Sequence, residues 1–127
     1  YHTFIDCVGQ PHLTHDEFPF KSLVTKKIVT PATLKFRSAT EAQQQLQEGN
    51  KDIERDSTGE YHLKVPGIAI NDCFQAIDQY GAYSSRIYIM AVPYIGGFNP
   101  DYSGLDFCEK ASGIISKSII HQLSSIV

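Results

Sequence analysis

The sequence has no excess of basic residues and no long apolar run. Its 127 residues include 11 lysines and arginines against 14 aspartates and glutamates, for a formal net charge of -3 and an isoelectric point near 5.9. Nucleic acids and anionic membranes attract strongly basic surfaces, so this balance argues against both as partners. A membrane-spanning helix needs about 20 consecutive apolar residues, and no run approaches that length. We therefore expect no nucleic-acid partner and no membrane span.

Cysteine is also scarce. Cys7, Cys73 and Cys108 are too far apart to form the paired spacing of a structural zinc site, so we predict no metal site. Free or buried thiols are the simplest interpretation, and a disulfide between Cys7 and Cys108 stays open if the protein is secreted. His12 and His15 lie beside two acidic residues, but without a helix or strand to fix their geometry we interpret them as part of a solvated loop.

What is present is the composition of a globular protein. Hydrophobic residues make up 42% of the chain and charged residues 20%, inside the range of folded domains. A chain of this length is long enough for one hydrophobic core. We predict a single domain over residues 1–127, with residues 33–127 as its core and residues 1–32 as an N-terminal extension to which the sequence assigns no role.

The most informative stretch begins with a strand that ends in an arginine, Arg37. Apolar and basic residues alternate in its sequence, Leu-Lys-Phe-Arg, as in a half-buried strand. Ser38 or Thr40 can cap a following helix, and Glu41 three residues after Ser38 completes a capping box. Gly49 then ends the helix. A guanidinium group beside helix N-terminal amides favours a phosphate.

The remaining segments are interpreted as short strands, helices and loops. Hydrophobic patterns predict strands over residues 4–8, 61–65, 68–70, 86–92, 107–115 and 118–123. Helices are predicted over residues 39–48 and, capped by Asn71 or Asp72, over residues 71–80. Residues 22–30 form either a short helix or two strand pieces, and residues 50–59 and 93–105 form loops. The predicted fold class is α+β, with small mixed, mainly antiparallel sheets and short helices.

This order of parts resembles the ADP-ribosyltransferase fold, in the branch whose motif is Arg, Ser-Thr-Ser, Glu. The chain is most similar to the bacterial toxins and effectors of that branch, and the resemblance covers roughly residues 33–127. It implies NAD as the substrate, with either mono-ADP-ribosylation of an acceptor protein or hydrolysis of NAD. It also implies a chain that is secreted or delivered into a host cell. A neighbouring domain or subunit, to which residues 1–32 can dock, is a further candidate partner.

The resemblance assigns roles to individual residues. Arg37, with Ser38 beside it, would bind the phosphate and ribose groups of NAD. Asn71 would hydrogen-bond the ribose or orient the catalytic glutamate, which would be Glu109. A fixed carboxylate at Glu109 would stabilise the positive charge that develops on the ribose as its glycosidic bond breaks.

The sequence departs from the family pattern at two places. Ala69-Ile70-Asn71 stands where the family has Ser-Thr-Ser, so Asn71 alone offers a side-chain hydrogen bond there. Phe107 stands two positions before Glu109, where the branch usually carries a glutamate or glutamine that engages the acceptor. The loop over residues 93–105 corresponds to the target-recognition segment, in which Phe98 and Tyr102 are the candidate contacts.

Two alternatives therefore stay open. The domain can keep the fold without the reaction and act as a protein-binding module. It can also be a papain-like thiol hydrolase, because Cys73 would lie in the first turn of a predicted helix, where the helix dipole lowers the pKa of a thiol. His62 is the nearest candidate in sequence for the histidine base that such an enzyme needs.

Overall fold

The computed structural model of the chain describes residues 11–95 and 105–125. Short helices and two small antiparallel sheets make up these residues, which confirms the predicted α+β class. The elements in chain order are η1 (His15–Glu17), α1 (Lys21–Thr25), β1 (Pro31–Lys35), α2 (Ala39–Gln47), β2 (Ile53–Arg55), β3 (Tyr61–Ile68), β4 (Gln75–Ile77), β5 (Tyr83–Tyr88), α3 (Val92–Ile95) and α4 (Leu105–Ser124). The strand predicted over residues 4–8 lies outside the described residues.

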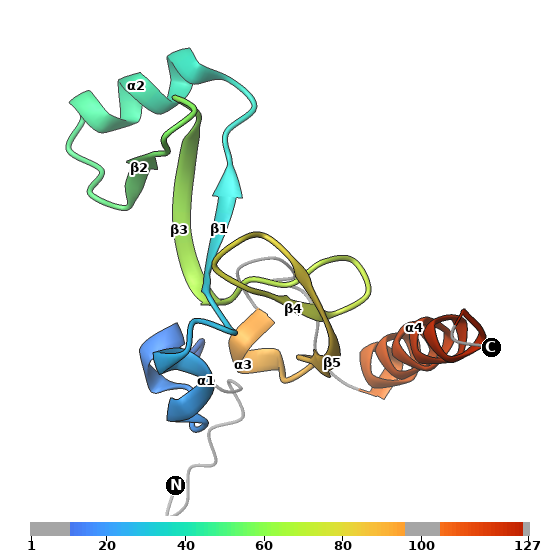
Figure 1. Ribbon diagram of the computed structural model, residues 1–127. Helices are drawn as coiled ribbons and strands as arrows, with labels where there is room; N and C mark the ends of the chain where they lie inside the picture. Colours follow the sequence, from blue (N-terminus) through green and yellow to red (C-terminus); the bar gives the residue numbers. More distant parts are fainter. Residues whose placement is uncertain (1–10, 96–104, 126–127) are drawn as a thin grey trace, which may run out of the picture.

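The larger sheet has three strands in the order β1-β3-β2. Figure 1 shows β1 and β3 as a long antiparallel pair that reaches from the main body of the molecule to α2 and β2 at its far end. The strand predicted over residues 61–65 is confirmed, and it continues to Ile68. Its alternating sequence gives the sheet one apolar face and one charged face.

Helix α2 forms where the sequence predicts it. The Ser38 hydroxyl accepts a hydrogen bond from the Glu41 amide at 3.3 Å, and Gly49 adopts a φ of +94° just after the helix ends. The predicted loop over residues 50–59 is wrong in part, because β2 pairs with β3 inside it. Ile53 of β2 and Ala42 of α2 are both buried at this end of the sheet.

The helix predicted over residues 71–80 is wrong, because Asn71 closes a turn there and the next residues pair with β5. The Asn71 Oδ1 accepts hydrogen bonds from the amides of Cys73 at 3.0 Å and Gln75 at 2.9 Å. Such local bonds satisfy backbone amides without a helix. Phe74 takes a left-handed φ of +65°, which completes the turn. The chain then continues as β4, which pairs with β5 in a two-stranded sheet and forms an isolated bridge from Ala76 to Ile70.

The central strand predicted over residues 86–92 is displaced and is not central. Strand β5 covers Tyr83–Tyr88 and lies in a two-stranded sheet. The apolar run continues into the short helix α3, in whose first turn Pro93 is well tolerated. Ile95 of α3 is fully buried. The predicted loop over residues 93–105 thus begins with the end of α3 and ends at the start of α4, and residues 96–104 lie outside the described part.

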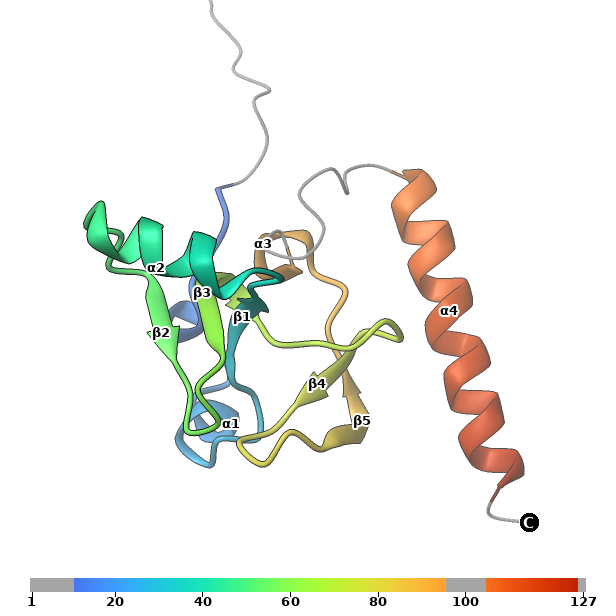
Figure 2. The ribbon, with the colours of Figure 1, turned by 90° about the horizontal axis from the view of Figure 1, so that it is seen from above.

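Two predicted strands, over residues 107–115 and 118–123, are wrong because both belong to the single helix α4. Phe107 and Ala111 are one helical turn apart and are buried, so they attach one face of α4 to the body. Farther along that face, the Tyr88 hydroxyl lies 3.2 Å from the Ser118 hydroxyl. Figure 2 shows α4 as a separate rod on the far side of β4 and β5 from the larger sheet.

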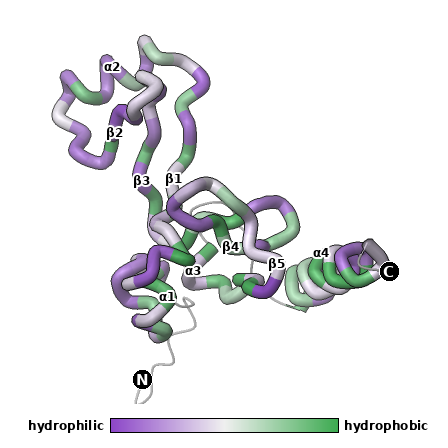
Figure 3. Tube along the Cα trace, viewed as in Figure 1, coloured by the Kyte–Doolittle hydropathy of each residue, from purple (hydrophilic) through white to green (hydrophobic). Residues whose placement is uncertain are grey.

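The main core lies in the body of the molecule. Buried residues from α3, α4, both sheets and the N-terminal segments form one cluster: Phe18, Val29, Ile68, Ile70, Phe74, Ala76, Ile89, Tyr94, Ile95, Phe107 and Ala111. Figure 3 shows this hydrophobic region around α3 and β4, whereas α2, β2 and the outer parts of β1 and β3 are largely hydrophilic. Among the described helices, none is long and apolar enough to cross a membrane.

Candidate functional site

One side of the larger sheet carries a histidine and several charged side chains that pair with one another. His62 lies on the central strand and pairs with Lys35 on β1 and Glu54 on β2. Directly opposed residues of antiparallel strands project to the same side, as do residues two apart along a strand. We use the name charged face for six residues on this side: Lys35, Glu54, Asp56, Glu60, His62 and Lys64.

Two ion pairs run across this face. The ammonium group of Lys35 lies 2.5 Å from a Glu60 carboxylate oxygen, and Lys64 pairs with Glu54. All four side chains are about half exposed, so each pair contributes little to stability, typically below about 1 kcal/mol. They place opposite charges next to each other across the strands that flank His62.

Asp56 is held rigidly at the turn between β2 and β3. Its Oδ1 accepts hydrogen bonds from the Thr58 hydroxyl at 2.7 Å, the Thr58 amide at 2.9 Å and the Glu60 amide at 2.9 Å. The bond from the Thr58 hydroxyl, followed by that from the Glu60 amide, lowers the pKa of Asp56 from 3.8 to about 2. Asp56 is therefore a fixed anion at neutral pH.

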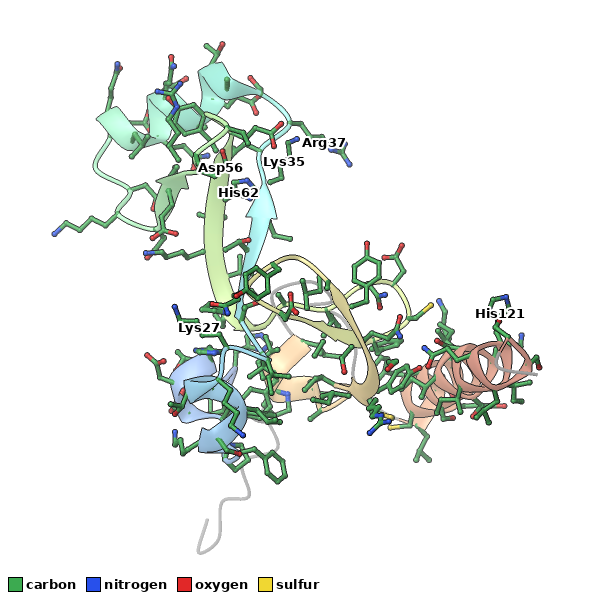
Figure 4. All side chains as sticks on the ribbon, viewed as in Figure 1. Lys27, Lys35, Arg37, Asp56, His62 and His121 are labelled. Carbon is green, nitrogen blue, oxygen red and sulfur yellow. The ribbon has the colours of Figure 1, made fainter. Side chains whose placement is uncertain are left out.

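His62 faces the second oxygen of the same carboxylate. Its Nε2 lies 3.1 Å from Asp56 Oδ2, and the imidazole side chain is 26% exposed. Figure 4 shows Asp56 and His62 together at the outer end of β3, with Lys35 beside them. A cavity of about 720 Å³ lies here, between the charged face and the turn that joins β4 to β5, and is lined by Thr33, Glu54, Arg55, Asp56, His62, Gln79 and Gly81.

A second cavity, of about 340 Å³, lies at the junction of β1 and α2 beside Arg37. It is lined by Lys35, Phe36, Arg37, Ala39, Gly59, Glu60 and Tyr61. Arg37 is exposed and points away from the sheet (Figure 4). Within residues 11–95 and 105–125 its guanidinium forms no ion pair or hydrogen bond. It is therefore open to an anionic ligand.

The structure brings only some of the sequence-predicted site residues together. Arg37 and Ser38 are neighbours at the start of α2. Asn71 lies in the turn before β4, where its side chain is engaged by Cys73 and Gln75. Glu109 lies on an exposed position of α4, and Figures 1 and 2 both show α4 well apart from α2. Arg37, Asn71 and Glu109 thus lie on three separate elements.

The other predicted contacts are placed differently or not at all. Phe107 belongs to helix α4 rather than to the strand predicted over residues 107–115. Its side chain is 5% exposed, and its ring lies 6.0 Å from that of Phe74. Phe98 and Tyr102 lie outside the described residues. Phe107 is therefore a core residue in this fold.

The helix on which the thiol-hydrolase interpretation depends, over residues 71–80, does not form. Cys73 lies in the turn before β4 and not at the N-terminus of a helix. His62 lies on the charged face of the other sheet, with Asp56 as its partner. Cys73 and Cys108 are both free thiols, and Cys7 lies outside the described residues.

Sequence reasoning missed the grouping of Asp56, Glu60 and His62. A signal for it exists, because the turn sequence Asp-Ser-Thr-Gly stands between Ile-Glu-Arg and the alternating segment that begins at Tyr61. Two such segments joined by a glycine-containing turn predict a hairpin. A hairpin would have placed the three side chains at one end of a sheet.

Comparison with protein-family models, with curated proteins and with solved structures finds no match to this chain.

Proposed function

We propose that this chain is a binding domain for a phosphate-bearing ligand, held by Arg37 in the cavity beside α2. The observation that carries the proposal is that Arg37 lines a concave cavity without a protein partner among the described residues. A planar guanidinium binds phosphate oxygens in a bidentate manner and stays charged at every physiological pH.

The surroundings of Arg37 support the same ligand class. Lys35 adds a second cation to the cavity, although Glu60 neutralises part of its charge. Phe36 and Tyr61 supply aromatic surface for a base or a sugar, and Arg55 lies over the Tyr61 ring at 5.6 Å. A ligand with both phosphate and ring groups fits this lining better than a free inorganic anion.

NAD is the ligand that the resemblance to ADP-ribosyltransferases predicts, with the consecutive residues Arg37 and Ser38, at the start of α2, as its proposed contacts. Transfer or hydrolysis would further require Glu109 to reach the nicotinamide ribose. Since Glu109 lies on α4, we propose binding as the primary function and keep ADP-ribosylation of an acceptor protein, as in a toxin or effector, as a prediction.

Calorimetric titration of the chelator-treated chain with NAD, and separately with ADP, tests the binding proposal. Arg37→Ala is expected to weaken binding about tenfold or more, because it removes a charge-assisted hydrogen bond. Arg86→Ala is the matched control, since Arg86 is an exposed arginine on β5. Absence of binding by the parent chain, or equal losses in both variants, would overturn the proposal.

Nicotinamide release from NAD tests the catalytic prediction on the same samples. Release that is lost in Glu109→Ala, while NAD binding persists, would support a transferase or hydrolase. Binding without any release would support a binding domain that lacks the reaction.

A further inference from the structure

We infer that Asp56, Glu60 and His62 form a site for a divalent transition-metal cation of the zinc type. This inference does not depend on the proposed function, because Arg37 takes no part in it. One potential ligand atom from each of the three side chains lies within 4.8 Å of the other two. The set combines an imidazole with two carboxylates, which suits zinc and its neighbours, whereas calcium and magnesium prefer oxygen ligands alone.

The spacing of the two best-fixed ligands agrees with shared coordination. Tetrahedral zinc with bonds of about 2.0–2.2 Å to nitrogen and oxygen holds its ligand atoms roughly 3.3–3.5 Å apart. His62 Nε2 and Asp56 Oδ2 are 3.1 Å apart. A cation therefore needs only a small movement of either side chain to replace the proton between them.

Asp56 is prepared for this role by its own hydrogen bonds. Its Oδ1 accepts three donors from the turn, so the carboxylate cannot rotate freely. Its Oδ2 is left toward His62 and the cavity. Supporting hydrogen bonds of this kind orient metal ligands and improve affinity.

Glu60 is the third ligand, and its carboxylate must leave another partner to bind the cation. It lies two residues before His62, on the same side of the chain, and its carboxylate is paired with Lys35. A cation with two charges competes well against one exposed ammonium group, because exposed ion pairs contribute little. Three protein ligands would leave one coordination position open, and the cavity of about 720 Å³ lies beside Asp56 and His62.

Titration of the chelator-treated chain with Zn²⁺ by calorimetry tests the site, with Mg²⁺ as the comparison ion. We expect one Zn²⁺ per chain and no comparable binding of Mg²⁺. His62→Asn is expected to weaken Zn²⁺ binding at least about tenfold. His121→Asn is the matched control, because His121 is an exposed histidine on α4, far from the charged face in Figure 4.

Lys35→Ala provides a test that a folding defect cannot imitate. Removing the ammonium group frees Glu60, so Zn²⁺ binding should become about two- to five-fold tighter, the change that corresponds to the contribution of an exposed ion pair. The inference is overturned if Zn²⁺ does not bind, if His62→Asn binds as well as the parent, or if binding is lost instead in His15→Asn, whose side chain lies beside Asp16.

Discussion

The side-chain carboxylate of Asp56 accepts the hydrogen bonds that stabilise the turn between β2 and β3. Hydrogen bonds from Thr58 and Glu60 stabilise its ionised form and lower its pKa to about 2. A carboxyl group whose pKa is lowered by folding stabilises the folded state above its ordinary pKa, and that stabilisation is lost as the pH falls toward the lowered value. For Asp56 the loss occurs between about pH 4 and pH 2.

Thr58→Ala removes the largest cause of the lowered pKa, so we expect the pKa of Asp56 to rise toward 3.8. The acid-induced loss of stability should then be smaller in the variant, because less of it depends on keeping this carboxylate ionised. The carboxyl chemical shift of Asp56, followed by NMR through an acid titration in the presence of a chelator, measures the change. Ser57→Ala, an exposed hydroxyl in the same turn, should leave the titration unaltered.

At the scale of elements, Gly67 sets how closely β3 approaches α3. Its φ is +111°, and a Cβ atom built on it would lie 2.1 Å from the backbone oxygen of Tyr94. Backbone cannot move aside as a flexible side chain can. The positive φ of Gly67 and the overlap between an added Cβ and the Tyr94 oxygen both therefore require glycine at this position.

Gly67→Ala should lower the free energy of unfolding by more than about 2 kcal/mol, the sum of a left-handed backbone penalty and an overpacking penalty. Gly113→Ala is the opposite case, because Gly113 lies inside α4 with open space where its Cβ would be. It should stabilise the chain by about 0.5–1 kcal/mol. Urea denaturation of both variants checks the pair, and a tolerated Gly67→Ala would contradict the close approach.

The elements that the sequence predicted correctly are those set by neighbouring residues. Helix α2 follows from its Ser38 cap and its Gly49 stop, both of which act within one turn of the helix. The segment after Asn71 was predicted wrongly because asparagine caps helices and also closes turns, and only the paired strand β5 decides between them. Local sequence could not show that choice.

Helix α4 was predicted as two strands because its apolar residues are consecutive and interrupted by serine and glycine. Its helical period is nevertheless present in the sequence, because Phe107, Ala111, Ile114 and Ile115 recur at i, i+4, i+7 and i+8, and these residues face the core. At the candidate site, Arg37 was found from its own segment, whereas the β2–β3 hairpin was missed although its turn sequence indicates it. The sequence could not show the pairing of β1 with β3, which are separated by α2 and β2 in the chain and bring Lys35 beside His62.

At the scale of the whole molecule, burial is unevenly distributed. The main cluster joins α3, α4, β4 and the inner end of β3, whereas α2 buries only Ala42 among its own residues. Regions with few buried apolar contacts open locally at lower free energy than the core. The outer end of the larger sheet, which carries both cavities, is therefore the less stable part.

Native-state hydrogen exchange measured by NMR should reveal this difference. We expect the amide of Ala42, which is bonded to Ser38 in α2, to exchange at a lower free energy than the amide of Ile89, which is bonded to Phe74. Equal protection of the two amides would instead mean that the chain opens as one cooperative unit, whatever the distribution of its core.

Two hydrogen bonds tie the smaller sheet to the segment that leads into β1. The Thr30 hydroxyl donates to the Ile77 carbonyl at 2.8 Å, and the Gln79 amide donates to the Lys27 carbonyl at 3.2 Å. Gln79 also lines the cavity in front of the charged face, so these bonds connect that wall of the cavity to the main body of the molecule. The opposite wall, on β2 and the outer end of β3, belongs to the less stable part of the chain. A ligand of this cavity would therefore meet one wall joined to the core and one wall that opens at lower free energy.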